Sequence, residues 1–236
     1  DCYFDSVPAL FITGQVNTHE LKGDSGIRQL GFQETDIVSM AVPITKLAIQ
    51  ITDPNQIVEV LEEAYHLAIN GRPGPVLIDI PMNIQKESVN QEQKTRALKP
   101  LLTSPISTVD LGLDHLLNGA ERPVVVIGAG AALAGTAPSI QSWCEAHQIP
   151  YVTSWGSLTY IDRSASSYFG SLGVYGARSA NWLVQSADQL IVFGSRLDNR
   201  QRTGNPNGFA PFAQITVIDI DDEELRKYHI HKNYKT

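Results

Sequence analysis

Two arginines and an aspartate directly follow an apolar run in GSRLDNR, residues 194–200. A guanidinium group carries forked N–H donors that match phosphate oxygens, so Arg196 and Arg200, with Asp198 between them, could hold a diphosphate. In open α/β folds, ligands bind where such loops leave the carboxyl ends of the strands. The pattern favours a nucleotide-like ligand, and a solvated loop with internal ion pairs is the alternative.

Acidic residues and glycines stand at two further ends of apolar runs. Asp219 and Asp221 end VIDID, where a carboxylate suits a ribose or ribityl hydroxyl, although Asp221 is equally suited to cap a helix. Gly128 and Gly130 follow VVVI as in a dinucleotide-binding turn. The third glycine of that fingerprint would fall at Leu133, and tight packing explains such glycines equally well.

The sequence SLGVYGARSAN places Gly173 and Gly176 before a helix, whose free N–H groups could bind an anion or a ring oxygen. A plain turn is the alternative. Trp155 in TSWG could stack on a ring, or it could be a core residue. GDSG at 23–26, with Asn55 farther on, has the form of a magnesium-diphosphate signature. Its polar flanks and the helix start at Asn55 argue against a metal, so we expect no metal ligands in the chain.

Alternating strands and helices must position these residues. The second half of the chain predicts helices at 108–118, 137–147 and 178–187, and strands at 123–130, 150–154, 189–195 and 215–221. Such alternation predicts an α/β, doubly wound, Rossmann-like parallel sheet. The first half predicts part of a second α/β domain. Its strands are expected at 9–16, 46–51 and 75–80, and its long helix is expected to begin at Asp53 as N-cap and to end at Gly71.

The domains are expected at residues 1–85 and 107–236, joined by a polar linker at 86–106 that begins to lose periodicity at Met82. The formal net charge of −7 argues against nucleic acid or an anionic membrane as partner. No apolar run is long enough to span a bilayer. Cys2 and Cys144 are the two cysteines, too few and too far apart for a disulfide framework, so we expect a cytoplasmic protein.

Seven blocks of the sequence, taken in order, resemble the acetohydroxyacid (acetolactate) synthase family and its thiamine-diphosphate-dependent relatives. The blocks are DSVPALFITGQV, GFQETDIV, PITK, GRPGPVLIDIP, SLGVYGARSAN, GSRLDNR and VIDID. The resemblance implies the C-terminal part of a pyrimidine-binding domain followed by a central domain that carries FAD. It also implies that the parent protein is a homo-oligomer with a 2-oxo acid substrate.

The resemblance also implies roles for individual residues. Gln33, with Phe32 next to it, is similar to a glutamine beside thiamine diphosphate. Lys46 is similar to a lysine near the substrate channel, and Arg72 to an arginine that contacts FAD. Other stretches similar to FAD-contacting stretches contain Gly130, Thr153, Ser154, Trp155, Gly156, Gly173, Val174, Tyr175, Gly176, Gly194, Arg196, Asp198, Arg200, Asp219, Ile220 and Asp221.

The expected function is that of a carboligase that decarboxylates pyruvate and transfers the two-carbon unit to a 2-oxo acid. In the family the catalytic glutamate lies before residue 1, and the Mg²⁺ site lies after residue 236 in the diphosphate-binding domain. We therefore expect a piece of a longer enzyme that is inert alone. The departures from the family pattern at Gly31, Val174 and Leu197 leave a keto-sugar acceptor open. A noncatalytic module that binds FAD or another nucleotide is a further alternative.

Overall fold

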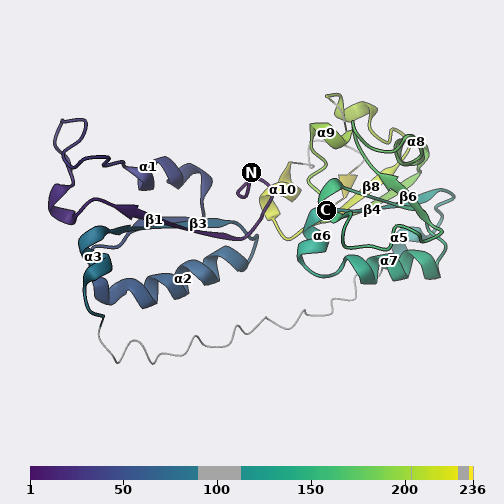
Figure 1. The fold of residues 1–236 in the computed structure, drawn as a ribbon. Helices are drawn as coiled ribbons and strands as arrows, with labels where there is room; N and C mark the ends of the chain where they lie inside the picture. The colour runs from purple at the N-terminus through teal and green to yellow at the C-terminus, as the bar shows by residue number, and fades with distance from the viewer. Residues whose placement is uncertain (90–112, 203, 228–233, 236) are drawn as a thin grey trace. The chain divides into compact units, whose positions relative to one another are not determined.

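The computed structural model describes residues 1–89, 113–202, 204–227 and 234–235. The chain divides into two compact units, Asp1–Ser107 and Thr108–Thr236 (Figure 1). Most of the expected linker lies outside the described residues, as does the start of the helix expected at 108–118. No helix in the described ranges has the length and apolar character needed to cross a membrane.

The first unit contains a three-stranded parallel sheet in the order β1-β3-β2. These strands are β1 (Ala9–Gln15), β2 (Leu47–Gln50) and β3 (Pro75–Pro81). Every residue of the central strand β3 is buried, as its continuous apolar sequence predicts for a strand covered on both faces. Asp79 is the polar residue in this run, and its side chain is 0% exposed.

Helices cover both faces of this sheet. The long helix α2 (Ile57–Ile69) packs its buried residues Val60, Ala64 and Ala68 against one face, and α1 (Ile37–Ala41) lies against β2 and β3 on the other (Figure 1). Short 3-10 turns connect these elements: η1 (Thr18–Glu20), η2 (Val42–Ile44) and η3 (Pro54–Gln56).

Two local predictions for this unit need correction. Asp53 does cap the helical segment, by accepting a bond from the backbone N–H of Asn55, but the first turn is the 3-10 turn η3 rather than an α-helix. The segment from Met82, where the sequence was expected to lose its periodicity, forms the helix α3 (Met82–Lys86), which ends at the first residue of the expected linker. Its buried Ile84 belongs to the apolar cluster that also contains the buried residues of α2, so α3 has a buried apolar contact despite the polar composition of the segment.

The second unit contains a six-stranded parallel sheet in the order β6-β5-β4-β7-β8-β9. The strands are β4 (Pro123–Ile127), β5 (Tyr151–Thr153), β6 (Tyr168–Ser171), β7 (Gln189–Phe193), β8 (Gln214–Ile218) and β9 (Tyr234–Lys235). The predicted doubly wound α/β class is thereby confirmed. Strand β6 lies between the strand predicted at 150–154 and the helix predicted at 178–187, where no element was predicted. Its four residues include Gly170 and carry no clear apolar pattern.

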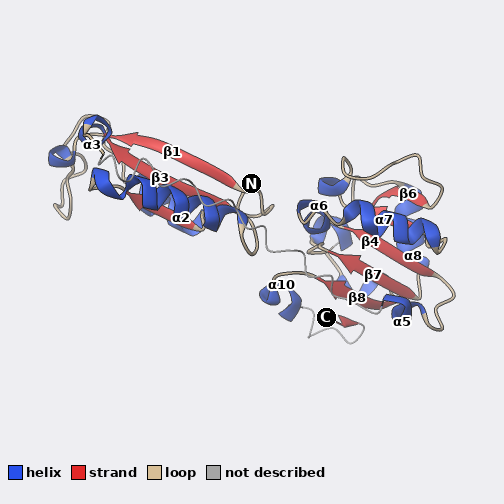
Figure 2. Cartoon of the chain, turned by 90° about the horizontal axis from the view of Figure 1, so that it is seen from below, coloured by secondary structure: helices blue, strands red, loops and turns tan. Residues whose placement is uncertain are grey.

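A separate apolar cluster covers each face of this sheet, whose strands β4, β7 and β8 lie side by side in Figure 2. Val124 and Val126 pack with α8 (Arg178–Ser186), whereas Val125 and Ile127 pack with α7 (Ala137–Ala146). The remaining helical elements are α5 (Leu113–Leu117), α6 (Ala129–Leu133), η4 (Trp155–Ser157), α9 (Asn199–Arg202), η5 (Pro206–Gly208) and α10 (Asp222–Arg226).

Candidate functional site

The predicted ligand-binding segments of the second unit all follow the carboxyl ends of parallel strands. Gly130 follows β4, Trp155 follows β5, Tyr175 follows β6, Arg196 follows β7 and Asp219 follows β8. Strand order reverses between β4 and β7, the arrangement that opens a ligand-binding crevice at this edge in doubly wound folds. The fold therefore brings these segments to one edge of one sheet.

An exposed aromatic pair marks this edge. The rings of Trp155 and Tyr175 lie 5.3 Å apart between centroids with an interplanar angle of 33°. They are 47% and 71% exposed, so Trp155 is not the core residue of the alternative interpretation. Val174 and Ile220 are also exposed apolar side chains in these loops. The edge thus offers apolar and aromatic surface of the kind on which a planar ring stacks.

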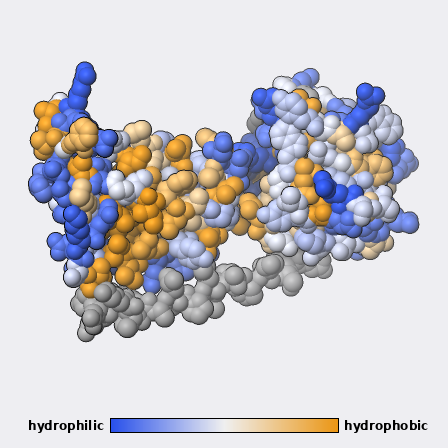
Figure 3. Space-filling model, viewed as in Figure 1, coloured by the Kyte–Doolittle hydropathy of each residue, from blue (hydrophilic) through white to orange (hydrophobic). Residues whose placement is uncertain are grey.

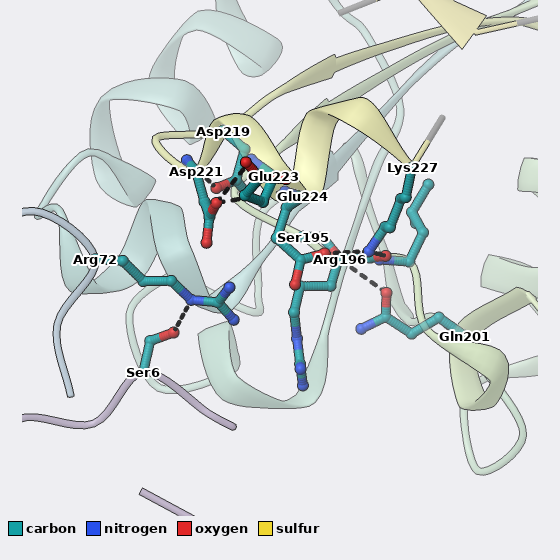
Figure 4. Close-up of polar contacts among 11 residues, drawn as sticks. Ser6, Arg72, Ser195, Arg196, Gln201, Asp219, Asp221, Glu223, Glu224 and Lys227 are labelled. Carbon is teal, nitrogen blue, oxygen red and sulfur yellow. Dashed lines mark hydrogen bonds and ion pairs between the residues drawn. The ribbon is translucent and has the colours of Figure 1, made fainter. Parts of the chain in front are cut away.

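Hydrogen bonds join the loops that carry the arginines to their neighbours. The N–H of Val174 donates to the carbonyl oxygen of Arg200 at 2.8 Å, which ties the loop after β6 to the loop after β7. Lys227 Nζ, next to the C-terminus of α10, donates to the carbonyl oxygen of Arg196 at 2.8 Å and pairs with Glu224 (Figure 4). Ser195 Oγ donates to Gln201 Oε1 at 2.7 Å. The backbone of Arg200 is therefore held by the backbone N–H of Val174, and that of Arg196 by the side chain of Lys227.

The three aspartates of the site are partly used within their own loops. Asp198 accepts bonds from the backbone N–H groups of Arg200 and Gln201, at the start of α9. Asp221 caps α10, the structural alternative that its sequence allowed. Asp219 accepts a bond from the N–H of Asp221 at 3.1 Å. Helix and turn N-termini orient these carboxylates, because each accepts from a backbone N–H that has no partner within its own turn.

The glycine-rich turn after β4 is closed by packing rather than open to a ligand. A Cβ at Gly128 would lie 2.1 Å from the carbonyl oxygen of Gly194, and the N–H of Gly130 donates to that same oxygen at 2.8 Å. Gly194 itself has a φ of +56°, a conformation that glycine adopts without strain. The packing alternative therefore accounts for Gly128 and Gly194, and Gly130 does not offer its N–H to a phosphate.

The residues that flank Trp155 differ in their exposure to solvent. Thr153 and Ser154 are buried, and Thr153 Oγ1 is bonded to the hydroxyl of Tyr168 at 3.0 Å. Gly156 is exposed, and a Cβ there would approach Ala129 Cβ to 2.7 Å, so this turn lies against α6. Within this predicted stretch, Trp155 and Gly156 are the residues that face solvent.

A cavity of about 270 Å³ lies under the loop after β6. Its walls include Gly173 and Val174, the amide side chains of Asn181 and Gln201, and Arg202. Among the described residues, Nε and Nη1 of Arg202 are the buried side-chain nitrogens without a hydrogen-bond partner. Buried guanidinium nitrogens without acceptors are costly, so this cavity is suited to a small anionic group.

In the first unit, Gln33 and Phe32 lie in the long loop after β1. Gln33 has a φ of +67°, which is uncommon for a residue with a side chain, and Phe32 is 86% exposed. Glu34 holds the loop through backbone bonds, because its two carboxylate oxygens accept from the N–H groups of Leu30 and Lys22. These bonds lower the pKa of Glu34 below its usual value.

Lys46 and Arg72 lie at the opposite end of the same sheet, where β2 and β3 begin. Lys46 Nζ donates to three backbone carbonyl oxygens, those of Leu67, Asn70 and Arg72, and burial lowers the pKa of this ammonium group. Arg72 Nε donates to Ser6 Oγ at 2.9 Å (Figure 4). The structure thus joins Lys46 to the turn of Arg72 but not to Gln33. The contact of Arg72 with FAD stays a prediction.

Sequence reasoning missed Asp79 and Gln15, which form a buried polar group at the sheet. Thr13 Oγ1 donates to Asp79 Oδ1 at 2.7 Å, and Gln50 Nε2 donates to Asp79 Oδ2 at 2.8 Å. Gln15 Nε2 donates both to Asp79 Oδ2 and to the carbonyl oxygen of Thr35. The available signal was a carboxylate inside a fully apolar strand, which is rare unless it is paired.

No cluster of three His, Cys, Asp or Glu side chains that could hold a metal ion occurs within the described ranges. The side chain of Asn55 donates to Asp53 at the start of η3, as a helix-start residue does.

The second unit belongs, by the order and direction of its strands, to the doubly wound class of α/β domains. The family described as "Thiamine pyrophosphate enzyme, central domain" matches residues 113–234. The chain belongs to this thiamine pyrophosphate enzyme family.

Curated relatives extend the similarity to both units. The chain is 36% identical over 231 residues to the acetolactate synthase large subunit of Corynebacterium glutamicum, covering 96% of this chain and 36% of the relative. It is 33% identical to acetolactate synthase isozyme 2 large subunit of Escherichia coli, covering 96% of this chain and 40% of that protein. For the large subunit of Lactococcus lactis the identity is 35%, covering 96% and 39%. The chain thus spans 36–40% of the length of these relatives, and the resemblance to acetolactate synthase is confirmed.

Proposed function

We propose that this chain is part of a thiamine diphosphate-dependent carboligase of the acetolactate synthase type. The observation that carries the proposal is the sequence identity of 33–36% to acetolactate synthase large subunits. This similarity covers 96% of the chain and so includes both units. The whole protein would decarboxylate pyruvate and transfer the two-carbon unit to a second 2-oxo acid. Thiamine diphosphate supplies the electron sink for this chemistry, and the protein supplies binding and orientation.

Gln33 is the residue of this chain that we assign to the thiamine side, with Phe32 beside it. Both are exposed in a loop whose backbone is held by neighbouring side chains. The Mg²⁺ ion would be held by the diphosphate-binding domain, which is a partner of this chain in the proposal. We propose that the chain alone does not turn over pyruvate, because it corresponds to 36–40% of the relatives' length.

FAD is the second proposed cofactor, and the carboxyl edge of the six-stranded sheet fits it. The exposed pair of Trp155 and Tyr175 suits stacking on a flavin or adenine ring. Arg196 and Arg200 suit the diphosphate, whereas the glycine turn after β4 is closed and its Gly130 N–H is already bonded to Gly194. The cavity beside Arg202 adds two buried guanidinium nitrogens without acceptors, which an anionic group of the ligand could satisfy. In this role FAD would be structural.

Titration with FAD tests this assignment. Purified chain is titrated while flavin absorbance and tryptophan fluorescence are followed, for the wild type, Arg196→Ala and Arg163→Ala. Arg163 is an exposed arginine in the loop before β6, so it matches the charge change without touching the proposed site. Loss of one guanidinium-phosphate contact is expected to weaken FAD binding by about tenfold or more.

Each outcome has a definite meaning. Binding that weakens in Arg196→Ala but not in Arg163→Ala, and that quenches Trp155, supports FAD at the carboxyl edge; Trp155→Phe identifies the quenched residue. A protein that stays colourless and indifferent to FAD removes the flavin from the proposal and leaves the thiamine function to be tested separately.

The thiamine function is tested on the whole protein that contains this chain. CO₂ release from pyruvate is measured with and without thiamine diphosphate and Mg²⁺, and the product is identified with 2-oxo acids and keto-sugars as competing acceptors. Thiamine-dependent formation of an acetohydroxy acid supports the proposal. Thiamine-dependent transfer to a keto-sugar alone would mean that the acceptor is a keto-sugar and not a 2-oxo acid. Activity without thiamine dependence, or no activity, would overturn the proposal of a carboligase.

We also propose that the parent protein is a homo-oligomer. The support is the edge strand β1, which pairs only with β3 among the described strands and carries the exposed side chains Leu10, Phe11 and Ile12. In Figure 3 apolar residues gather on the first unit where Figure 1 shows β1 and α2. An unpaired, apolar edge is a surface that favours association.

A further inference from the structure

A fully buried carboxylate joins all three strands of the first sheet. Thr13 of β1 and Gln50 of β2 lie opposite Asp79 of β3 in the strand registers, and both donate to its side chain. Gln15, two residues beyond Thr13 on the same face, supplies a third donor at 3.3 Å. An ionised carboxylate accepts hydrogen bonds only, so these donors match it.

Sheet stability alone does not account for this group. An apolar residue at Asp79 would continue the run of β3, whereas a buried carboxylate has a desolvation penalty that its hydrogen bonds must offset. Replacing such buried polar groups by well-packed apolar residues is often neutral or stabilising. The buried carboxylate is therefore better explained if its hydrogen bonds hold a neighbouring part of the chain in place.

Gln15 connects the carboxylate to the loop that carries Gln33. Its Nε2 donates to Asp79 Oδ2 and, at 2.7 Å, to the carbonyl oxygen of Thr35, while its Oε1 accepts from the N–H of Val16. Asp79 thus fixes the direction of the amide, since an amide held by an acceptor on one N–H presents the other in a defined direction. The second N–H reaches the loop two residues after Gln33.

The loop needs such an anchor because its conformation is strained. Gln33 has a φ of +67°, a conformation that is unfavourable for a residue with a side chain and persists only where the surroundings hold it. Thr35, held by Gln15, accepts the N–H of Ile37 at the start of α1. A loop anchored on both sides of Gln33 keeps this residue in one orientation.

We propose that Asp79 is a positioning residue that orients the Gln33 loop through the side chain of Gln15. Asp79 acts on the loop geometry and does not itself reach the loop. The importance of this geometry for a thiamine cofactor rests on the proposed function, but the connection between Asp79, Gln15 and Thr35 does not.

Two glutamines make a matched pair of variants for the test. Gln15→Met and Gln50→Met each remove one amide donor from the same oxygen, Asp79 Oδ2, and both residues are partly buried. Only Gln15 also bonds to Thr35. A role limited to sheet stability predicts similar effects of the two changes, whereas a positioning role predicts an effect on the loop for Gln15→Met alone.

Hydrogen exchange in the intact chain is the measurement. The reporter amides are Gly31, Glu34 and Ile37, each bonded to a carbonyl oxygen within or beside the loop. Loss of one hydrogen bond is expected to accelerate their exchange by about three- to tenfold in Gln15→Met, and by less than about twofold in Gln50→Met. Asp79→Asn is expected to accelerate loop exchange as Gln15→Met does.

Equal acceleration in the two glutamine variants, or none in Gln15→Met, would overturn the positioning role. Loop exchange that stays unchanged in a folded Asp79→Asn protein would overturn the role of Asp79. If Asp79→Asn fails to fold, the glutamine pair can still overturn the proposal through the link from Gln15 to Thr35, because each change leaves the carboxylate with two donors. No cofactor takes part in the measurement. Failure of the proposed thiamine function therefore leaves the result unaffected, and failure here leaves the carboligase test unaffected.

Discussion

Lys46 Nζ donates to the carbonyl oxygen of Arg72 at 2.9 Å, and so links the start of β2 to the turn before β3. The same ammonium group donates to the carbonyl oxygens of Leu67, in the last turn of α2, and of Asn70. A cation at this position satisfies carbonyl groups that a helix leaves without partners and matches the negative end of its dipole. Gly74 makes room for it, since a Cβ there would lie 3.0 Å from Lys46 Cδ.

The first prediction concerns this cation. Lys46→Met keeps the length of the side chain but removes all three donors, so we expect the free energy of unfolding to fall by about 2 kcal/mol and the amides of the Arg72 turn to exchange faster. Lys86→Met is the control, because Lys86 is exposed near the end of α3. Urea unfolding with hydrogen exchange provides both readouts. Equal effects of the two changes would contradict the capping role of Lys46.

The second prediction concerns pH and the Gln33 loop. The N–H of Leu30, and next that of Lys22, lower the pKa of Glu34 below 4.5. Because the folded pKa lies below the unfolded one, the stabilisation is complete above pH 4.5 and is lost as the pH falls through the folded pKa. Protection of the Leu30 amide, followed by NMR from about pH 6 to about pH 3, is expected to fall at the acid end.

Two controls define that experiment. In Glu34→Gln the amide of Leu30 should be less protected at neutral pH and should show no acid transition, since the titrating group is gone. Amides in the middle of α2 should keep their protection in both proteins until the whole unit unfolds. An acid transition of the same size in Glu34→Gln would assign it to another group.

The third prediction tests the closed turn between β4 and β7. In Gly128→Ala the new Cβ would stand 2.1 Å from the carbonyl oxygen of Gly194, and we expect a loss of more than about 3 kcal/mol in the free energy of unfolding. Gly204→Ala is the control, because a Cβ at Gly204 would have no atom within 4 Å. Thermal unfolding of both variants measures the difference. A Gly128→Ala protein as stable as Gly204→Ala would show that the turn opens readily.

The sequence predicts the strands of both sheets well where burial is strong. β3, β4 and β7 are continuous apolar runs closed by turn residues, and such runs are specified by local composition. β6 escapes prediction because it has a partly exposed, glycine-containing sequence, and its pairing with β5 is a nonlocal contact. Likewise α3 contributes the buried Ile84 to the core, a contact that the polar composition of its segment does not reveal.

The candidate site is predictable in position but not in detail. Parallel strands place their following loops at one edge, so the neighbourhood of Trp155, Tyr175 and Arg196 follows from the element order. Which groups the loops use internally depends on tertiary packing. Gly194 meets Gly128 across 66 residues of sequence, and Asp79 meets Gln15 across 64. Neither pair has a sequence signature, because the contact partners lie on different strands or loops.

The fourth prediction uses the two cysteines. Cys144 is completely buried in the core between α7 and the sheet, and burial raises the pKa of its thiol to about 12. The thiolate is the reactive form, so at about pH 8 a thiol reagent should modify Cys2 alone in the folded protein and both cysteines after denaturation. Cys2→Ser should therefore abolish the rapid reaction. Rapid modification that persists in Cys2→Ser would mean that the core around Cys144 opens.

The last prediction addresses the edge strand β1. The side chain of Ile12, on this edge strand, is 59% exposed. A charged side chain on an edge strand opposes pairing with the edge strand of another molecule. Ile12→Lys should therefore shift the chain toward the monomer in sedimentation velocity over a range of concentrations, without lowering the free energy of unfolding of the monomer. Tyr65→Lys, an exposed change on α2 in the same unit, is the control. If both variants associate as the wild type does, β1 is not the surface through which copies of this chain meet.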